Sequence, residues 1–435
     1  MRGFSSILCL ALFRGLLSPL TMAVEPQKPE EEAAAFDGYI VKLKEDAPVF
    51  YMLVIQFPRQ VHTVQVGETV YSIAGRYGLT LRQLYRNNPI LGGEPVIYPG
   101  QTLVISYEGE REGTLSVNGY AYPFISKELL QATIPYLTFL TPFTYGFGED
   151  GHLVPLGDQV LVAMALEGGA APMMHLSTLN DEGHFSGQLA ADIFNNMAAQ
   201  DRLIENIIQT MTQKGYVGLD VDFEYIPEDA KRQYPVFLDK LTRALNPLGF
   251  SVLVALAPKT YAEQPGTLYE SHDYRAIGAA VNEVLLMTYE WGYAYGPPMA
   301  VSPIANMRAV IEYALTEIPT EKIWLGLPNY GYDWPLPYVQ GQTRATSLSS
   351  QQAIALAIEH NTAIQYDTQS QSPFFFYENE AGEQHVVWFE DARSMREKLA
   401  LIRDYDLRGG AYWNLMRHFP QNWRILNALY TIREP

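Results

Sequence analysis

The stretch that decides the fold is Gly215–Tyr225, which reads GYVGLDVDFEY. As an extended strand it has a period of two, so Asp220, Asp222 and Glu224 point to one face. Neighbouring side chains on that face lie roughly 6.5–7 Å apart. In a poorly solvated place they resist ionising together, so we expect at least one carboxyl group with a raised pKa. A carboxyl group that keeps its proton near neutral pH suits general acid catalysis.

The residues around this stretch indicate whether it is a central strand or an edge strand. Three carboxylates in alternation also fit a solvated acidic face on an edge strand, or a cation site. The back of the strand, however, is apolar, with Val217, Leu219, Val221 and Phe223. Sequence typical of helices lies on both sides. The stretch therefore reads as a central parallel strand that leads into a helix.

The same run resembles the D-G-x-D-x-D-x-E signature of glycoside hydrolase family 18, the chitinase-like (β/α)8 barrels. Gly218, Asp220, Asp222 and Glu224 match it, whereas Val217 stands where the first Asp is usual. The resemblance implies that Glu224 is the catalytic acid. The departure at Val217 is expected at the buried start of the strand. It therefore bears on how the charges of the carboxylates are tuned more than on the presence of the catalytic acid.

Length and composition describe a large, acidic, globular chain. Its 435 residues predict two or three domains, and 48% hydrophobic with 18% charged residues excludes a disordered chain. The formal net charge of −18 disfavours nucleic acid and anionic membranes as partners. A glycan is compatible with this charge, and no motif implies a cofactor.

The N-terminus has the pattern of an export signal. Residues 1–24 begin with Arg2, continue with an apolar core and end with small residues suited to cleavage. The single cysteine, Cys9, lies inside this signal, so we expect no disulfide in the mature chain. No later stretch is long and apolar enough to span a membrane. Residues 25–60 read as a Pro/Glu/Ala-rich linker and a short β segment, within which 36–57 alternate apolar and charged residues.

A second informative segment covers residues 61–107. Thr69 is suited to cap a first helix that Gly78 ends, and Thr80 starts a second helix. A turn at Pro99-Gly100 then leads into a returning strand. This strand–helix–helix–strand order resembles a LysM module. The motif residues are Val66-Gly67-Glu68-Thr69, Ile73-Ala74, Tyr77-Gly78, Leu84, Asn87-Asn88 and Pro99-Gly100-Gln101.

The LysM resemblance implies binding of polymers that contain N-acetylglucosamine, either peptidoglycan or chitin. The expected contacts lie in the loops before the first helix and after the second, at Gly67, Glu68, Thr69, Asn88 and Pro89. The alternative is a structural cap domain that binds no ligand.

From residue 113 to 435 the chain alternates apolar strands with amphipathic helices, which predicts a parallel sheet. We expect eight strands, at 115–122, 136–145, 159–166, 216–224, 250–257, 283–289, 322–330 and 409–414. This number fits an α/β fold, a (β/α)8 TIM barrel. An open doubly wound sheet would require a glycine-rich phosphate loop after the first strand, and none is present. Residues 335–390 read as a small α+β insertion, with a helix at 350–360 and strands around 374–377 and 385–389.

Chemistry in a TIM barrel lies at the carboxyl ends of the strands. Met287-Thr288-Tyr289-Glu290-Trp291 resembles the M-x-Y-D element of the family, with Glu290 in place of Asp. At the eighth strand, Trp413 matches the family's tryptophan beneath the sugar. At the third, Leu166–Gly169 stands where S-x-G-G is usual. The expected substrate-binding residues are Trp413, Glu290, Trp291, Asn329 and Tyr330, because sugar faces stack on aromatic rings and sugar hydroxyls need polar partners.

The family resemblance implies a retaining, substrate-assisted mechanism. Glu224 protonates the leaving oxygen, and the 2-acetamido carbonyl of the substrate attacks the anomeric carbon. Asp222 and Tyr289 hold the acetamido group, and Asp220 shares a proton with Asp222. The LysM module joined to this barrel resembles the spore-germination branch, whose N-acetylglucosaminidases act on spore cortex peptidoglycan fragments. This implies a bacterial protein that is secreted or associated with the cell wall or spore.

Two other functions stay open at this point. One is a secreted chitinase that uses the same site on chitin. The other is a non-catalytic lectin, which the presence of Glu224 disfavours. A metal-dependent hydrolase is disfavoured as well, because the 8 histidines do not accompany the carboxylates at ligand spacing.

Overall fold

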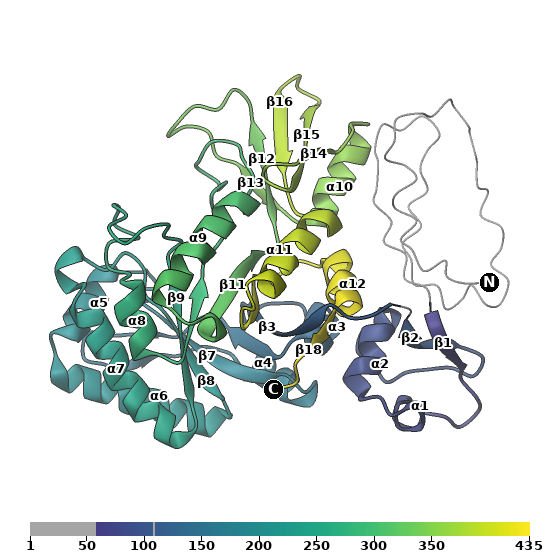
Figure 1. Cartoon of the computed structure of the whole chain (residues 1–435), viewed down its shortest axis with the longest axis horizontal. Helices are drawn as coiled ribbons and strands as arrows, with labels where there is room; N and C mark the ends of the chain where they lie inside the picture. Colours follow the sequence, from purple (N-terminus) through teal and green to yellow (C-terminus); the bar gives the residue numbers. More distant parts are fainter. Residues whose placement is uncertain (1–57, 108) are drawn as a thin grey trace.

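The computed structural model describes residues 58–107 and 109–435 (Figure 1). The expected signal peptide and the segment 36–57 lie outside the described residues. The chain from residue 58 onward forms a small βααβ module, then a closed barrel of parallel strands that carries an α+β insertion. The predicted fold class is therefore confirmed. No helix in the described ranges has the length and apolar character to cross a membrane.

The small module is built from β1 (Pro58–Thr63), α1 (Val70–Tyr77), α2 (Leu81–Asn87), η2 (Pro89–Leu91) and β2 (Thr102–Tyr107). The two strands pair antiparallel. Thr69 and Thr80 each cap a helix through a capping box, and Gly78 ends α1 with φ of 66°. These boundaries confirm the predicted ones, because short polar caps supply the backbone partners that a helix end lacks.

Eight parallel strands form the barrel wall. They are β3 (Gly113–Ala121), β4 (Phe139–Pro142), β7 (Ala171–Ser177), β8 (Gly218–Asp222), β9 (Ser251–Leu256), β10 (Glu283–Leu286), β11 (Ile323–Pro328) and β17 (Gly409–Trp413). Each pairs with the next, and β17 returns to β3 in the register Gly409↔Ser116, which closes the barrel. A short strand, β18 (Tyr430–Ile432), pairs with the start of β3.

Helices cover the outside of this wall. They are α3 (Lys127–Thr133), α4 (Gln159–Glu167), α5 (Gly187–Phe194), α6 (Met197–Lys214), α7 (Gln233–Leu245), α8 (Tyr274–Ala280), α9 (Ile304–Glu317), α11 (Ala392–Asp404) and α12 (Pro420–Leu429). The main core lies between strands and helices: Leu219, Val221 and Phe223 of the deciding stretch are all fully buried in it. Their burial explains why the carboxylates between them face the barrel interior.

The third predicted strand is wrong. Residues 159–166 form helix α4, and the third barrel strand is β7, twelve residues further along. The run QVLVAMAL is apolar at nearly every position, and periodicity alone does not separate a short strand from a helix in such a run. Leu166–Gly169 is the end of α4 and not a strand end, so the expected counterpart of S-x-G-G does not lie there.

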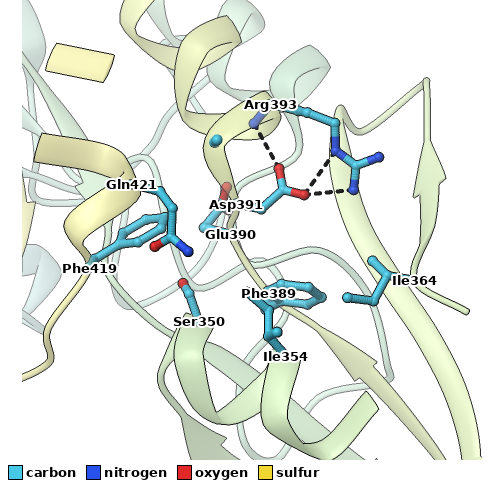
Figure 2. Close-up of a pocket in the computed structure, with 10 residues that line it drawn as sticks. Ser350, Ile354, Ile364, Phe389, Glu390, Asp391, Arg393, Phe419 and Gln421 are labelled. Carbon is cyan, nitrogen blue, oxygen red and sulfur yellow. Dashed lines mark hydrogen bonds and ion pairs between the residues drawn. The ribbon is translucent and has the colours of Figure 1, made fainter. Parts of the chain in front are cut away.

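The insertion forms a separate antiparallel sheet above the barrel (Figure 1). Its elements are β12 (Gly331–Pro335), β13 (Thr346–Leu348), α10 (Ser350–Glu359), β14 (Gln365–Asp367), β15 (Ser372–Glu378) and β16 (Gln384–Trp388). The helix and the strand pair predicted within this segment are present. Where the insertion returns to the barrel, Asp391 caps α11 and accepts hydrogen bonds from Arg393, beside a small pocket that Ser350 and Gln421 also line (Figure 2).

The module is fixed to the barrel by helix α2. The guanidinium groups of Arg82 and Arg86 are buried and form ion pairs with Glu434. Arg82 also donates to the carbonyl oxygens of Gly169 and Leu137, which lie two residues before strands β7 and β4. The module therefore docks at the amino ends of the barrel strands.

Candidate active site

The candidate site is built on β8. Asp220 and Asp222 lie on this strand, and Glu224 follows it by two residues. On the opposite face, Phe223 packs against the rings of Tyr234 and Phe237, at centroid distances of 5.9 and 6.2 Å. The alternation expected from the sequence is present from Leu219 to Glu224, since apolar residues face the helices and carboxylates face the barrel interior. The expectation that Val217 lies at the buried start of the strand is wrong, because Val217 precedes β8 and is 38% exposed.

The backbone that carries Glu224 is held from two sides. The buried imidazole of His272 accepts from the Ala257 amide at Nδ1 (2.8 Å), so its Nε2–H donates to the Phe223 carbonyl (3.1 Å). Burial lowers the pKa of His272 to about 4, which keeps this ring neutral. At Gly187, the first residue of α5, a Cβ would lie 1.9 Å from the carbonyl oxygen of Tyr225. Glycine at this position lets the helix approach the acid-bearing segment.

Asp220 is fully buried and has few partners. One carboxylate oxygen accepts a hydrogen bond from the Tyr120 hydroxyl (2.5 Å), and the other has no partner among the described residues. Desolvation is the largest cause that raises its pKa, to about 7; the Glu283 charge adds to this and the Tyr120 hydrogen bond opposes it. A carboxyl group with this pKa changes protonation close to neutral pH.

Asp222 and Glu224 complete the row. Burial raises the pKa of Asp222 well above its usual value, and the charges of Glu224 and Asp220 raise it further. Burial also raises the pKa of Glu224. None of the ion pairs among the described residues joins Asp220 or Asp222 to a lysine or arginine. Like charges without a cation favour a shared proton, which agrees with the expectation from the alternating carboxylates.

Tyr289 and Trp413 lie above the barrel interior, next to these carboxylates. Both pack on the hydrophobic cluster inside the barrel. Burial and the charges of Asp222, Glu224 and Asp220 raise the pKa of Tyr289 well above its usual value, so its hydroxyl stays a donor. The indole ring of Trp413 has aromatic neighbours in Phe143 (4.9 Å) and Tyr120 (5.7 Å). The arrangement offers an apolar floor, a hydroxyl donor and a carboxyl acid at the carboxyl ends of the barrel strands.

Comparison with known proteins agrees with this geometry. The model of "Glycosyl hydrolases family 18" matches residues 178–417, and that of the "LysM domain" matches residues 62–106. The chain belongs to glycosyl hydrolase family 18. It is 40% identical to the "Cortical fragment-lytic enzyme" of Bacillus subtilis (strain 168) over 86% of this chain and 98% of that relative.

Solved structures resemble the family 18 chain closely. The crystal structure of the Bacillus megaterium spore cortex-lytic enzyme SleL has a TM-score of 0.73 and 37% identity, over 88% of this chain and 89% of that one. A chitinase from Chromobacterium violaceum has a TM-score of 0.67 at 24% identity, over 72% of this chain and 98% of that one. The latter similarity supports the fold alone.

Two of the other expected substrate-binding residues, Glu290 and Asn329, form hydrogen bonds within the protein. Glu290 accepts hydrogen bonds from the hydroxyls of Tyr330 and Tyr332. Asn329 is buried, and its Nδ2 donates to the carbonyl oxygens of Asn414 (2.7 Å) and Arg417 (2.9 Å). Asn329 therefore holds the loop after β17. Contact of Trp291, Asn329, Tyr330 or Glu290 with a sugar stays a prediction.

The expected glycan-binding residues of the LysM module also have internal partners. Glu68 contacts His62 Nε2 (2.7 Å) and Arg76 (2.6 Å), and Thr69 caps α1. Asn88 is buried and bonds the backbone of Leu84 and Val104. Gly67 and Pro89 stand beside Val66 and Ile90, whose side chains are 88% and 81% exposed. Sugar contact in this module stays a prediction, with apolar surface available beside the expected loops.

Three residues of the site were missed from the sequence. Tyr120, at the end of β3, is the hydrogen-bond donor to Asp220. Phe143 packs on Trp413, and His175, on β7, faces Asp222. Tyr120 could have been predicted as a site residue, because it is an aromatic residue at a strand end. His175 could not, because the third strand was placed at 159–166 and so did not include it.

Proposed function

We propose that this family 18 chain is a retaining N-acetylglucosaminidase that cleaves β-1,4 bonds after N-acetylglucosamine in peptidoglycan, with spore cortex fragments as substrate. The observation that carries the proposal is the row Asp220, Asp222 and Glu224 beside Tyr289 and Trp413, with no lysine or arginine of the described residues paired to the two aspartates. The relatives named for cortex-fragment lysis support the choice of substrate.

In the first half of the reaction, Glu224 acts as general acid. Its raised pKa keeps a proton available, and this proton passes to the glycosidic oxygen as the bond to the anomeric carbon breaks. The carbonyl oxygen of the substrate's 2-acetamido group forms the new bond to that carbon, which gives an oxazolinium ion. Asp222 faces the acetamido nitrogen, whose positive charge develops in this step, and the Tyr289 hydroxyl donates to the acetamido oxygen.

In the second half, water attacks the anomeric carbon from the side that the leaving group vacated. Glu224, now ionised, takes the proton of the water, and the bond to the acetamido oxygen breaks. Two inversions at one carbon retain the anomeric configuration. Asp220 shares a proton with Asp222 and so allows Asp222 to become negative only when the oxazolinium is present. This chemistry requires a 2-acetamido group on the cleaved sugar.

The LysM module suits an enzyme that works on an insoluble polymer. LysM and family 18 domains bind glycans that contain N-acetylglucosamine, such as peptidoglycan, and this indicates association with the cell wall or spore. We further propose that residues 1–24 direct export, and that the module keeps the enzyme on the glycan through the expected loops at Gly67–Thr69 and Asn88–Pro89.

Mass spectrometry of digested peptidoglycan tests the function. Cortex and vegetative peptidoglycan and chitin are each treated with the wild type, Glu224→Gln and Glu228→Gln. Glu228 is an exposed residue in the adjacent 3-10 helix and serves as the matched control. We expect products with reducing N-acetylglucosamine from the wild type and the control, and a roughly 10³-fold loss for Glu224→Gln.

The other outcomes separate the alternatives. Cleavage of chitin without cleavage of peptidoglycan would assign a chitinase. No products from any of the three proteins, with the glycans still bound, would assign a lectin and overturn the proposal.

A further inference from the structure

The structure brings a buried histidine to the carboxylate row. His175 lies on β7 in register with Asp220 on β8, and it is 2% exposed. Its ring meets Tyr120 edge to face at 5.7 Å and Phe143 at 4.7 Å. These contacts fix the ring plane inside the barrel. Its Nε2 then faces the Asp222 carboxylate, 3.7 Å from Oδ2.

The other nitrogen of the ring meets a hydroxyl group. Nδ1 lies 2.6 Å from Thr144 Oγ1, which is itself 3.0 Å from both Ser177 Oγ and the Tyr145 carbonyl. A hydroxyl group can donate to Nδ1 or accept from it. His272 differs here, because a backbone N–H faces its Nδ1 and permits one tautomer alone. The structure therefore leaves both neutral tautomers open to His175.

Asp222 needs a partner of this kind. Its Oδ1 has no hydrogen-bond partner among the described residues. None of the ion pairs in the described part of the chain joins it to a lysine or arginine. The titratable groups around the row are Asp220 on β8 with Glu224 just after it, Tyr120 on β3, Glu283 on β10 with Tyr289 just after it, and Tyr234 on α7. A neutral imidazole can present either an N–H donor to the Asp222 anion or a bare nitrogen acceptor to protonated Asp222, depending on its tautomer.

We propose that His175 is a positioning residue for Asp222, whose two protonation states it meets with two tautomers of the same neutral ring. When Thr144 donates to Nδ1, the proton sits on Nε2 and faces the Asp222 anion. When Thr144 accepts from Nδ1–H, the bare Nε2 faces protonated Asp222. Burial lowers the pKa of His175 to about 3, so the ring stays neutral where the enzyme works. This inference rests on the proposed function of Asp222.

Two substitutions test the role. Glutamine places an amide near the position of Nε2, whereas phenylalanine keeps the ring volume and removes both nitrogens. In His175→Phe both protonation states of Asp222 lose the facing nitrogen. Because the contact with the anion is the stronger of the two, its loss raises the pKa of Asp222. We expect kcat to fall about 10- to 100-fold with KM nearly unchanged, and the acid limb of kcat/KM to move to higher pH. His175→Gln should restore kcat to within about threefold of the wild type and return the acid limb.

The assay uses the full chain on a soluble N-acetylglucosamine oligosaccharide across pH 4–9, with thermal unfolding to confirm that each variant is folded. If His175→Phe does not fold, His175→Asn replaces it, because asparagine keeps the contact with Thr144 but is too short for Asp222, and the same acid-limb shift is expected. An unchanged pH profile in a folded Phe or Asn variant overturns the role, as does equal loss in the Gln and Phe variants without a shift. A wild type that cleaves neither these oligosaccharides nor cortex peptidoglycan instead overturns the proposed function.

Discussion

Two buried aspartates, Asp158 and Asp220, show how differently one protein can treat the same side chain. Both are 0% exposed. Asp158 accepts hydrogen bonds from the hydroxyls of Tyr145 and Tyr216 and forms an ion pair with Lys214 (2.5 Å). Asp220 has one tyrosine hydroxyl and no cation, and one of its oxygens has no partner among the described residues.

This difference distinguishes a carboxylate that stabilises the fold from one that can take part in proton transfer. A buried carboxylate that has a cation and two donors serves the fold, because removal of any partner leaves a charge uncompensated. A buried carboxyl group without a cation costs stability as an anion, so the protein keeps it close to a change of protonation. Donors and counter-charge, rather than burial, therefore distinguish the two sites.

The largest effect should come from removing the charge of Asp220. Its pKa is about 7 in the folded chain and about 4 in the unfolded chain, so between these values the folded state holds an extra proton. Stability must then fall as pH rises through this window, and Asp220→Asn abolishes that slope. From pH 5 to pH 8 we expect the free energy of unfolding of the variant to rise by roughly 3 kcal/mol relative to that of the wild type. Urea unfolding at both pH values measures it.

Asp229→Asn, at an exposed position, is the control and should keep the wild-type slope. A constant difference between Asp220→Asn and the wild type across this range would show that Asp220 is ionised throughout, like a structural carboxylate.

A smaller effect is expected at the other aspartate. Lys214→Met leaves the Asp158 carboxylate buried without its cation, whereas Lys214 itself is 26% exposed. We expect a loss of about 2 kcal/mol in the free energy of unfolding, less than for a fully buried pair. The kcat of the folded fraction should not change. Denaturant unfolding and activity at a temperature where both proteins are folded measure these quantities, and a fall in kcat would mean that the two aspartates are coupled.

The smallest effects come from a matched pair of tyrosines. Tyr216→Phe removes one donor of Asp158, and we expect about 1 kcal/mol of lost stability with unchanged kcat. Tyr120→Phe removes the donor of Asp220, and we expect about a tenfold loss in kcat/KM and an acid limb at higher pH. Equal loss of activity in the two variants would contradict the comparison.

The sequence predicts most of this site because chemistry and strand geometry coincide in Gly215–Tyr225. Alternation places the carboxylates on one face whatever the tertiary structure. The error at the third strand had a physical origin: Pro172 gives β7 a residue without an N–H, which makes it a poor strand by pattern, whereas α4 is apolar enough to pass for one.

Tertiary contacts account for the rest. Asn329 follows a strand like a substrate ligand, yet its amide hydrogens go to two carbonyl oxygens more than 80 residues away in the sequence. His175 meets Asp222 only because two strands pair in one register. No local sequence pattern predicts either contact, because each depends on how segments far apart in the sequence pack together.

The clamp of Arg82 and Arg86 on Glu434 has a consequence for how the enzyme meets its polymer. It seats the LysM module at the amino ends of the barrel strands, whereas Glu224 follows the carboxyl end of β8. In this layout the LysM module and the candidate catalytic acid lie at opposite ends of the barrel. Under the proposed function, a short oligosaccharide would reach the LysM loops or the catalytic site but not both, whereas a wall of many glycan strands would let the enzyme bind one strand and cleave another.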